Sequence, residues 1–165
     1  MSVQKVKDYL AQFGADTRIL QPEASSATVE LAAQALGIMP ARIAKTLSFW
    51  TDDRCTLIVA AGDAKIDNPK YRKYFHCKAK MLKPDEVQKA TGHPVGGVCP
   101  FALPDSVDVF LDLSLKRFET VFPACGSGHS AIELNLNELF RYSRAKAWVD
   151  VCKGWQPEKN NDNKE

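Results

Sequence analysis

The stretch that decides the fold lies between residues 43 and 61 and reads IAKTLSFW (43–50), TDDR (51–54) and CTLIVAA (55–61). In the first segment polar and apolar residues partly alternate, as they do in a strand with one buried face. The third segment is rich in branched residues, which favour strands. The polar residues between them are typical of a turn, so the stretch predicts a β-hairpin.

Helical spacing of apolar residues in the first two segments, and proline or capping residues at the ends of the others, predict helices on both sides of this hairpin. They are expected at 3–13, ending at Gly14, at 28–36, after the candidate caps Ser25 and Ser26 and before Gly37, and at 67–75, 84–91 and 135–142. Further strands are expected at 17–20, 107–111, 120–123 and 131–134. Because the elements do not follow a strict βαβ order, they favour an α+β fold with a mixed sheet over a doubly wound one.

Length and composition predict one globular domain over residues 1–155, followed by a polar, disordered tail at 156–165. Of the 165 residues, 45% are hydrophobic and 25% are charged. No run is apolar enough to span a membrane, and residues 1–9 lack the apolar core of a secretory signal. We therefore expect a cytoplasmic protein with no membrane partner.

The net charge is only +2, from 22 Lys and Arg against 20 Asp and Glu. This balance neither supports nor excludes binding to RNA. Any contact with a nucleic acid has to come from a local basic patch, because the global charge cannot supply it.

Lys45 is the first residue with a chemical signature, because it interrupts an otherwise apolar strand. An ammonium group that pointed into the core would be costly to desolvate. The side chain therefore faces either solvent, as on an ordinary exposed strand face, or a ligand with a phosphate or carbonyl group.

Two glycine-rich segments have the composition of ligand-binding turns. The first is TGHPVGGVCPF (91–101), in which glycine allows backbone N–H groups to approach a ligand. The second is ACGSGHS (124–130), which suits an anion-binding or oxyanion nest and equally a plain hairpin connection. Its spacing matches neither a P-loop nor the nucleophile elbow of serine hydrolases.

The cysteines and histidines lack the spacing of a metal site or a disulfide framework. The five cysteines form no CxxC pair and lie at intervals of 20 or more residues: Cys55, Cys77, Cys99, Cys125 and Cys152. In a reducing compartment such cysteines are mostly small buried hydrophobes. His76, His93 and His129 are scattered, and a Cys125–His129 dyad is the remaining thiol alternative.

Four stretches in this order resemble the YbaK-like aminoacyl-tRNA deacylases, a family that includes the editing domain of bacterial prolyl-tRNA synthetases and free-standing relatives. They are the helix at 28–37 that ends in Ala-Leu-Gly, IAKTLSF (43–49), AGDAKID (61–67) and the glycine segment 91–101. The order continues through 109–115, 124–130 and 131–134, so the resemblance covers roughly residues 20–145. Two departures leave the substrate open: Cys99 stands where free-standing relatives often have serine, and the Gly126 loop lacks the GxxxP form of the alanine-editing branch.

The resemblance implies an α+β fold with a mixed, strongly curved sheet, flanking helices and a pocket for the aminoacylated 3′ end of tRNA. It implies that Lys45 contacts the substrate. Our hypothesis is that N–H groups of 126–130 hold the carbonyl or the developing oxyanion, that Lys45 holds the phosphate of the terminal adenosine or the carbonyl, and that Asp63 orients Lys45 or the ribose. The candidate catalytic residues are Lys45, Gly126, Ser127 and Gly128, and the candidate substrate-binding residues are Thr46, Asp63, Gly96, Gly97, Asp112, His129 and Ser130. Structural alternatives are a turn role for Asp63, a cap role for Asp112 and no role for His129.

An aminoacyl ester is already activated, so its hydrolysis needs only a positioned water, a polarised carbonyl and a pocket of the right size. We expect no metal and no cofactor. The expected substrates are tRNA esters of small wrong amino acids, namely alanine, serine or cysteine, and the expected partners are the tRNA 3′ end and a synthetase, without DNA. The alternatives are a non-catalytic domain that binds tRNA or a synthetase, and a thiol-dependent hydrolase with Cys125 as nucleophile.

Overall fold

The computed structural model describes residues 2–156, so most of the predicted tail, 157–165, lies outside the described residues. The helices are α1 (Ser2–Ala11), α2 (Val29–Leu36), α3 (Asn68–Phe75), α4 (Pro84–Thr91) and α5 (Leu136–Tyr142). The strands are β1 (Ile43–Thr51), β2 (Arg54–Ala61), β3 (Lys65–Ile66), β4 (Lys80–Met81), β5 (Val107–Asp112), β6 (Thr120–Pro123), β7 (Leu134–Asn135), β8 (Ala147–Val149) and β9 (Cys152–Lys153). Short 3₁₀ helices lie at Asp16–Arg18, Pro40–Arg42 and Leu113–Arg117.

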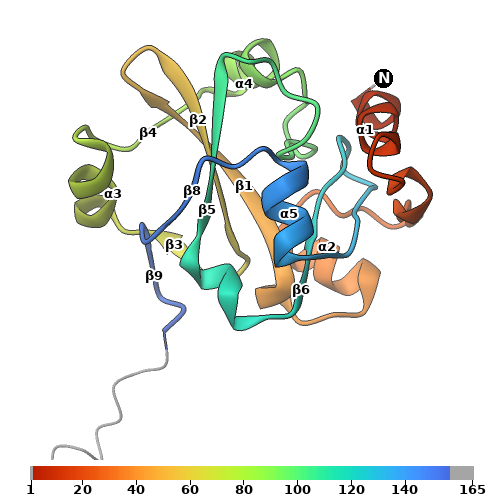
Figure 1. Ribbon diagram of the computed structural model, residues 1–165. Helices are drawn as coiled ribbons and strands as arrows, with labels where there is room; N and C mark the ends of the chain where they lie inside the picture. Colours follow the sequence, from red (N-terminus) through yellow and green to blue (C-terminus); the bar gives the residue numbers. More distant parts are fainter. Residues whose placement is uncertain (1, 157–165) are drawn as a thin grey trace, which may run out of the picture.

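One curled, mixed sheet forms the centre of the fold (Figure 1). Its strand order is β7-β6-β1-β2-β5-β8, and β4 pairs with the outer part of β1. β1 runs antiparallel to β2 and parallel to β6, whereas β2 runs parallel to β5. In Figure 1, α3 lies to one side of the sheet, and α1, α2 and α5 lie to the other. The predicted α+β class with a mixed, curved sheet is confirmed.

The predicted hairpin is confirmed, and each of its strands extends one residue into the predicted turn. The register pairs Lys45 with Ala60 and Trp50 with Cys55. β2 is buried from Cys55 to Ala61, because it lies between β1 and β5 in the middle of the sheet. The hairpin thus forms the centre of the sheet: β4 and β6 pair with β1, and β5 pairs with β2.

All of the predicted helices are present, with small differences at their ends. Thr28 caps α2 by accepting a hydrogen bond from the Leu31 N–H at 3.2 Å, and Gly37 ends the helix with a left-handed φ of 69°. The candidate caps Ser25 and Ser26 were therefore wrong, because they contact another loop instead. The Ser26 N–H donates to the Gly128 carbonyl at 2.5 Å.

Two predicted strands are largely wrong. Residues 17–20 begin as a 3₁₀ helix at Asp16–Arg18, and only Leu20 forms a bridge, to Ala131. The tight turn places the Arg18 guanidinium on Glu138 at 2.7 Å. Of the predicted strand 131–134, the bridge at its start and β7 at its end remain. Residues 132 and 133, between the bridge and β7, have an irregular backbone.

Among residues 2–156, no helix combines the length and the apolar character that a membrane crossing needs.

Gly62, directly after β2, is the glycine with the closest backbone neighbour. A Cβ there would lie 2.0 Å from the Pro40 carbonyl oxygen and 2.7 Å from Val29 Cγ1. The 3₁₀ helix at Pro40–Arg42 therefore packs against the turn only because residue 62 has no side chain.

We expect Gly62→Ala to lower the free energy of unfolding by roughly 3 kcal/mol, the upper part of the range for overpacking, because a backbone clash cannot be relieved by a rotamer change. The measurement is urea unfolding followed by circular dichroism. Gly14→Ala is the matched control: nothing lies within 4 Å of that position, whose φ is +70°. It should cost roughly 1 kcal/mol for the left-handed backbone alone. Equal losses in the two variants would contradict the packing argument.

Candidate functional site

A cavity of about 400 Å³ opens between the residues before and at the start of α2, β1, and the segment from β4 to α4. Its volume lies within the range of small-molecule binding sites, roughly 300–1,000 Å³. The walls are mostly apolar and include Val29, Ile43, Leu47, Leu82, Val87 and Val98. Three of the predicted site residues line it, namely Lys45, Thr46 and Gly96.

Lys45 is half-buried, and its ammonium group is held by the turn after β2. The Nζ donates to the Gly62 carbonyl at 3.3 Å and to the Ala64 carbonyl. Burial lowers the pKa of this ammonium, an effect partly opposed by the nearby Cys152 and Asp63. Because an ammonium has three N–H donors, one remains for a ligand. The structure thus places an oriented cation at the wall of an apolar cavity.

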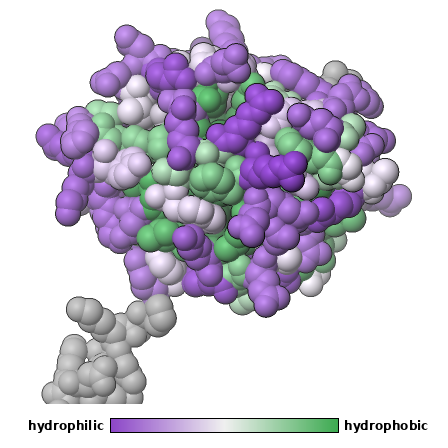
Figure 2. Space-filling model, in the orientation of Figure 1, coloured by the Kyte–Doolittle hydropathy of each residue, from purple (hydrophilic) through white to green (hydrophobic). Residues whose placement is uncertain are grey.

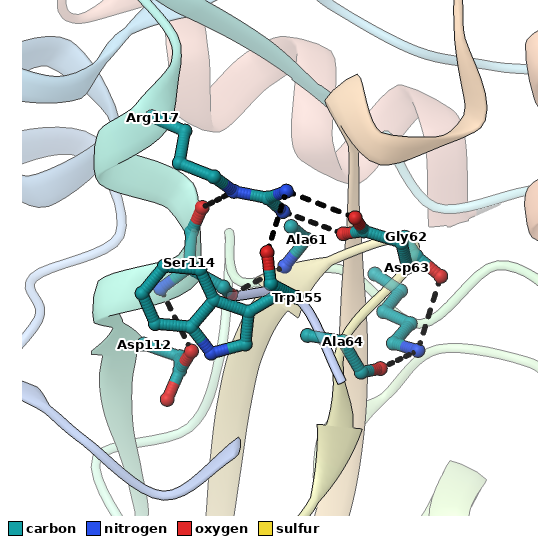
Figure 3. A network of polar contacts seen from close by, with 9 residues as sticks. Ala61, Gly62, Asp63, Ala64, Asp112, Ser114, Arg117 and Trp155 are labelled. Carbon is teal, nitrogen blue, oxygen red and sulfur yellow. Dashed lines mark hydrogen bonds and ion pairs between the residues drawn. The ribbon is translucent and has the colours of Figure 1, made fainter. Parts of the chain in front are cut away.

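Asp63 does not bind Lys45, although it stands between the two residues whose carbonyls do. Its carboxylate forms a bidentate pair with Arg117, with N–O distances of 2.5 and 2.9 Å (Figure 3). Hydrogen bonding from Arg117 holds the pKa of Asp63 below its usual value. Arg117 was missed from the sequence, where 54 residues separate the two partners. Asp63 is not part of the cavity wall.

Asp112 is fully buried and caps the 3₁₀ helix at Leu113–Arg117, which is the structural alternative to a substrate-binding role. It accepts hydrogen bonds from the Ser114 N–H at 2.9 Å and the Val151 N–H at 3.0 Å. The Ser114 hydroxyl in turn accepts the Ala61 N–H at 3.1 Å (Figure 3). Asp112 therefore lies outside the cavity but supports the end of β2, next to the turn that holds Lys45.

The two glycine turns, far apart in the sequence, are in contact. Gly96 lines the cavity with a left-handed φ of 87°. A Cβ on Gly97 would lie 2.6 Å from the Ser127 Cα, so the two backbones touch only because residue 97 is glycine. Gly128 in turn packs against Ala27, another residue of the cavity wall.

Within the 124–130 loop, several donors are already used. Ser130 is buried, and its Oγ accepts the N–H groups of Cys125 and Ser127, each at 3.2 Å. The Ser127 Oγ accepts the His129 N–H at 3.1 Å. The N–H groups of Gly126 and Gly128 have no acceptor within the described chain. His129 is exposed, and only Ala124 of this loop lines the cavity.

Two hydroxyl groups at the cavity lack hydrogen-bond partners. They are the Ser26 Oγ and the Thr46 Oγ1, both buried and without an acceptor or donor among the described residues. A buried polar atom without a partner costs roughly 1–3 kcal/mol, so a ligand that displaced the side chains covering these hydroxyls and paired with them would recover part of that free energy. Thr46 was predicted as a site residue, whereas Ser26 had been interpreted only as a helix cap.

The thiols near the site are buried. Cys125 and Cys99 are both 0% exposed. Burial raises the pKa of Cys99 to about 12 and the pKa of Cys125 well above its usual value. The buried His93 contacts the Cys99 sulfur at 3.5 Å and the Phe101 carbonyl at 2.8 Å. Within residues 2–156, no group of His, Cys, Asp and Glu is arranged to hold a metal ion.

Sequence comparisons connect this geometry with known proteins. The model of the aminoacyl-tRNA editing domain family matches residues 23–142. The chain is 54% identical over 157 residues to the uncharacterized protein YwhH of Bacillus subtilis, and the match covers 94% of this chain and 100% of that protein. It is 28% identical over 120 residues to a proline–tRNA ligase of Geobacillus sp., covering 70% of this chain but only 21% of the ligase.

Solved structures give the same picture of the fold. A candidate trans-editing enzyme for prolyl-tRNA synthetase superposes with a TM-score of 0.83 at 26% identity, covering 93% of this chain and 98% of the other. The hypothetical protein APE2540 superposes with a TM-score of 0.80 at 27% identity, covering 90% and 99% of the two chains. The curled mixed sheet and its helices are thus shared over nearly the whole length of each.

We expect iodoacetamide to alkylate Cys77 in the folded protein well before Cys99 and Cys125, because the thiolate is the reactive form and Cys77 is only partly buried. Peptide mass spectrometry after a timed reaction at pH 8 measures the order. All five thiols should react in denaturant, which serves as the control. Modification of Cys125 as fast as Cys77 in native buffer would contradict the interpretation that burial protects this thiol.

Proposed function

Because the chain belongs to the aminoacyl-tRNA editing domain family, we propose that it is a hydrolase that removes small, wrongly attached amino acids from tRNA in the cytoplasm. The observation that carries this proposal is the Lys45 ammonium, held by two backbone carbonyls at the wall of an apolar cavity. A cation in this position suits a substrate whose reacting oxygen gains negative charge.

In the proposed reaction a water molecule attacks the carbonyl carbon of the aminoacyl ester. The bond between that carbon and the ribose oxygen breaks, the amino acid leaves as its acid, and the ribose hydroxyl recovers a proton. Lys45 binds the carbonyl oxygen or the phosphate of the terminal adenosine with its remaining N–H donor. The N–H groups of Gly126 and Gly128, which have no acceptor within the described chain, are the second candidate donors to the oxyanion.

Selection among amino acids would come from the shape of the cavity. An apolar wall rejects a larger side chain by steric clash, but it separates substrates that differ by one methylene only about 10- to 200-fold. Such an enzyme suits correction in trans after a synthetase, with alanyl, seryl and cysteinyl esters as substrates. The unpaired hydroxyls of Ser26 and Thr46 favour a substrate that offers a polar atom to the cavity.

Two alternatives fit the observations less well. A thiol-dependent hydrolase needs a reactive cysteine, whereas Cys125 is fully buried with a raised pKa. A domain that binds tRNA or a synthetase without hydrolysis accounts less well for a half-buried ammonium, whose desolvation is costly, at the wall of a cavity of small-molecule size. Loss of the amino acid from charged tRNA is the measurement that separates this binding domain from a hydrolase.

We expect at least one ester in a panel of tRNAs charged with alanine, serine, cysteine, threonine or proline to be lost faster with the protein than in buffer. Alanine, serine and cysteine are the expected substrates, and Lys45→Ala should abolish most of the turnover because the oriented cation is lost. The measurement is loss of radiolabelled amino acid from tRNA over time.

Cys125→Ser is the matched control for Lys45→Ala and should keep its turnover, since the mechanism assigns the thiol no chemical step. Circular dichroism of both variants checks that each is folded. No accelerated loss of any ester would overturn the enzyme proposal and favour the binding domain. Wild-type rates in Lys45→Ala would overturn only the assignment of the site.

A finer test addresses the hydroxyl of Thr46. We expect Thr46→Val to lower turnover about 5- to 10-fold, the equivalent of one lost hydrogen bond to the substrate. Its free energy of unfolding should not fall, because the hydroxyl has no protein partner to lose. Single-turnover kinetics and urea unfolding are the measurements, and Thr17→Val, at an exposed position, is the control. Unchanged kinetics in Thr46→Val would exclude a role for this hydroxyl.

A further inference from the structure

The positive charge of this chain is concentrated in one segment. Between Asn68 and Pro84 there are six Lys or Arg residues and no Asp or Glu, although the whole chain has a net charge of only +2. The segment runs from α3 through an extended linker and β4 to the start of α4. It is the kind of local basic patch that nucleic-acid binding requires in a nearly neutral protein.

Five of these cations are exposed, and we call them together the basic ridge: Arg72, Lys73, Lys78, Lys80 and Lys83. Within the described residues none of the five has a carboxylate at ion-pair distance. The sixth cation, Lys70, differs because it pairs with Asp150 at 3.0 Å. Figure 2 shows hydrophilic side chains crowded along the edge of the molecule where Figure 1 places α3 and α4.

The basic ridge reaches the rim of the cavity. Met81 and Leu82, which lie between the ridge residues Lys80 and Lys83, both line the cavity wall. A polymer with one end in the cavity can therefore cross the ridge as it leaves.

Aromatic side chains accompany the cations. Trp50 lies opposite Lys80 in the β1–β4 pairing, and the two line a shallow hollow together. Tyr74, on α3, is 45% exposed. Exposed rings beside cations are typical of surfaces that bind single-stranded nucleic acid, because bases stack on the rings while phosphates contact the cations.

Acidic groups near the basic ridge are few. Asp52 and Asp53, in the β1–β2 turn, share the shallow hollow with Lys78 and Lys80 and weaken the potential there. Glu86 accepts the Lys83 backbone N–H at 2.8 Å as part of the helix cap, and the exposed Asp85 lies in the same first turn of α4. The linker side, where Arg72 and Lys78 line a second hollow, has no acidic residue in its wall.

We propose that the basic ridge binds the phosphate backbone of the single-stranded acceptor end of tRNA and of the nucleotides that follow it. The identity of the RNA rests on the proposed function, whereas the surface rests on the charges and on its position at the cavity rim. The ridge supplies affinity for RNA without reading its sequence, because its cations contact phosphates and not base edges.

The test compares the triple variant Lys78→Gln/Lys80→Gln/Lys83→Gln with a control of equal charge change, Lys7→Gln/Lys116→Gln/Lys146→Gln, whose lysines are exposed elsewhere. Fluorescence anisotropy measures binding of uncharged, unfractionated tRNA between 50 and 200 mM salt. We expect the ridge variant to bind at least about tenfold more weakly at low salt, with a slope of log K against log salt reduced by about 2 to 3. The control variant should bind like the wild type.

Hydrolysis of a 3′-aminoacyl-adenosine fragment, which has no phosphodiester for the ridge to bind, separates this inference from the proposed function. The ridge variant should keep most of its kcat on the fragment and lose kcat/KM mainly on full-length aminoacyl-tRNA. Wild-type binding of tRNA by the ridge variant would overturn the inference whether or not the protein is a hydrolase. Equal losses of tRNA binding in the ridge and control variants would also overturn it. So would a wild-type protein that binds phosphatidylserine vesicles but not tRNA. Ridge-dependent tRNA binding without hydrolysis of any ester would support the inference while refuting the proposed function.

Discussion

Lys45 carries a charge on a strand that is otherwise largely apolar, and its place depends on the turn that follows β2. The carbonyls of Gly62 and Ala64 accept two of the ammonium N–H groups and so replace part of the lost hydration. They can do so because Gly62, lacking a side chain, lets the turn pack under Pro40. The antiparallel register of β1 and β2 then brings Lys45 close to this turn, and the cavity forms along the same strand.

Because the groups that accept hydrogen bonds from Lys45 are neutral carbonyls, its positive charge stays available to a ligand. Had Asp63 paired directly with Lys45, the ion pair would have neutralised the cation at the cavity wall. Instead the carboxylate is occupied by Arg117, from the 3₁₀ helix that Asp112 caps. The same helix holds the end of β2 through the Ser114 hydroxyl and the Ala61 N–H. Asp63 and Asp112 thus act on Lys45 indirectly, by fixing the backbone that binds it.

The sequence predicted what local patterns encode. The hairpin follows from alternation and turn residues, and α2 follows from apolar spacing that ends at Gly37, although its cap is Thr28 and not the predicted Ser25 or Ser26. These local patterns were enough to predict a mixed sheet with flanking helices. The short strand β4 and the fate of residues 17–20 were not predictable in this way, because two-residue pairings and an ion pair to Glu138 depend on distant segments. The same limit hid Arg117 and the unpaired hydroxyl of Ser26, since a missing partner is visible only in three dimensions.

In the proposed function the basic ridge binds the phosphates of tRNA and the cavity binds the amino acid, so the two sites contribute differently to fidelity. The phosphates of a correctly charged and a wrongly charged tRNA are identical, so the basic ridge binds both equally and lowers KM without discriminating between them. In the proposed reaction, discrimination therefore has to arise at the amino acid, where the apolar wall would limit size and the hydroxyls of Ser26 and Thr46 would favour a polar atom. Because size alone separates close homologues only about 10- to 200-fold, the proposed function assigns to the hydroxyl pair any preference for seryl or cysteinyl esters over alanyl esters of similar volume.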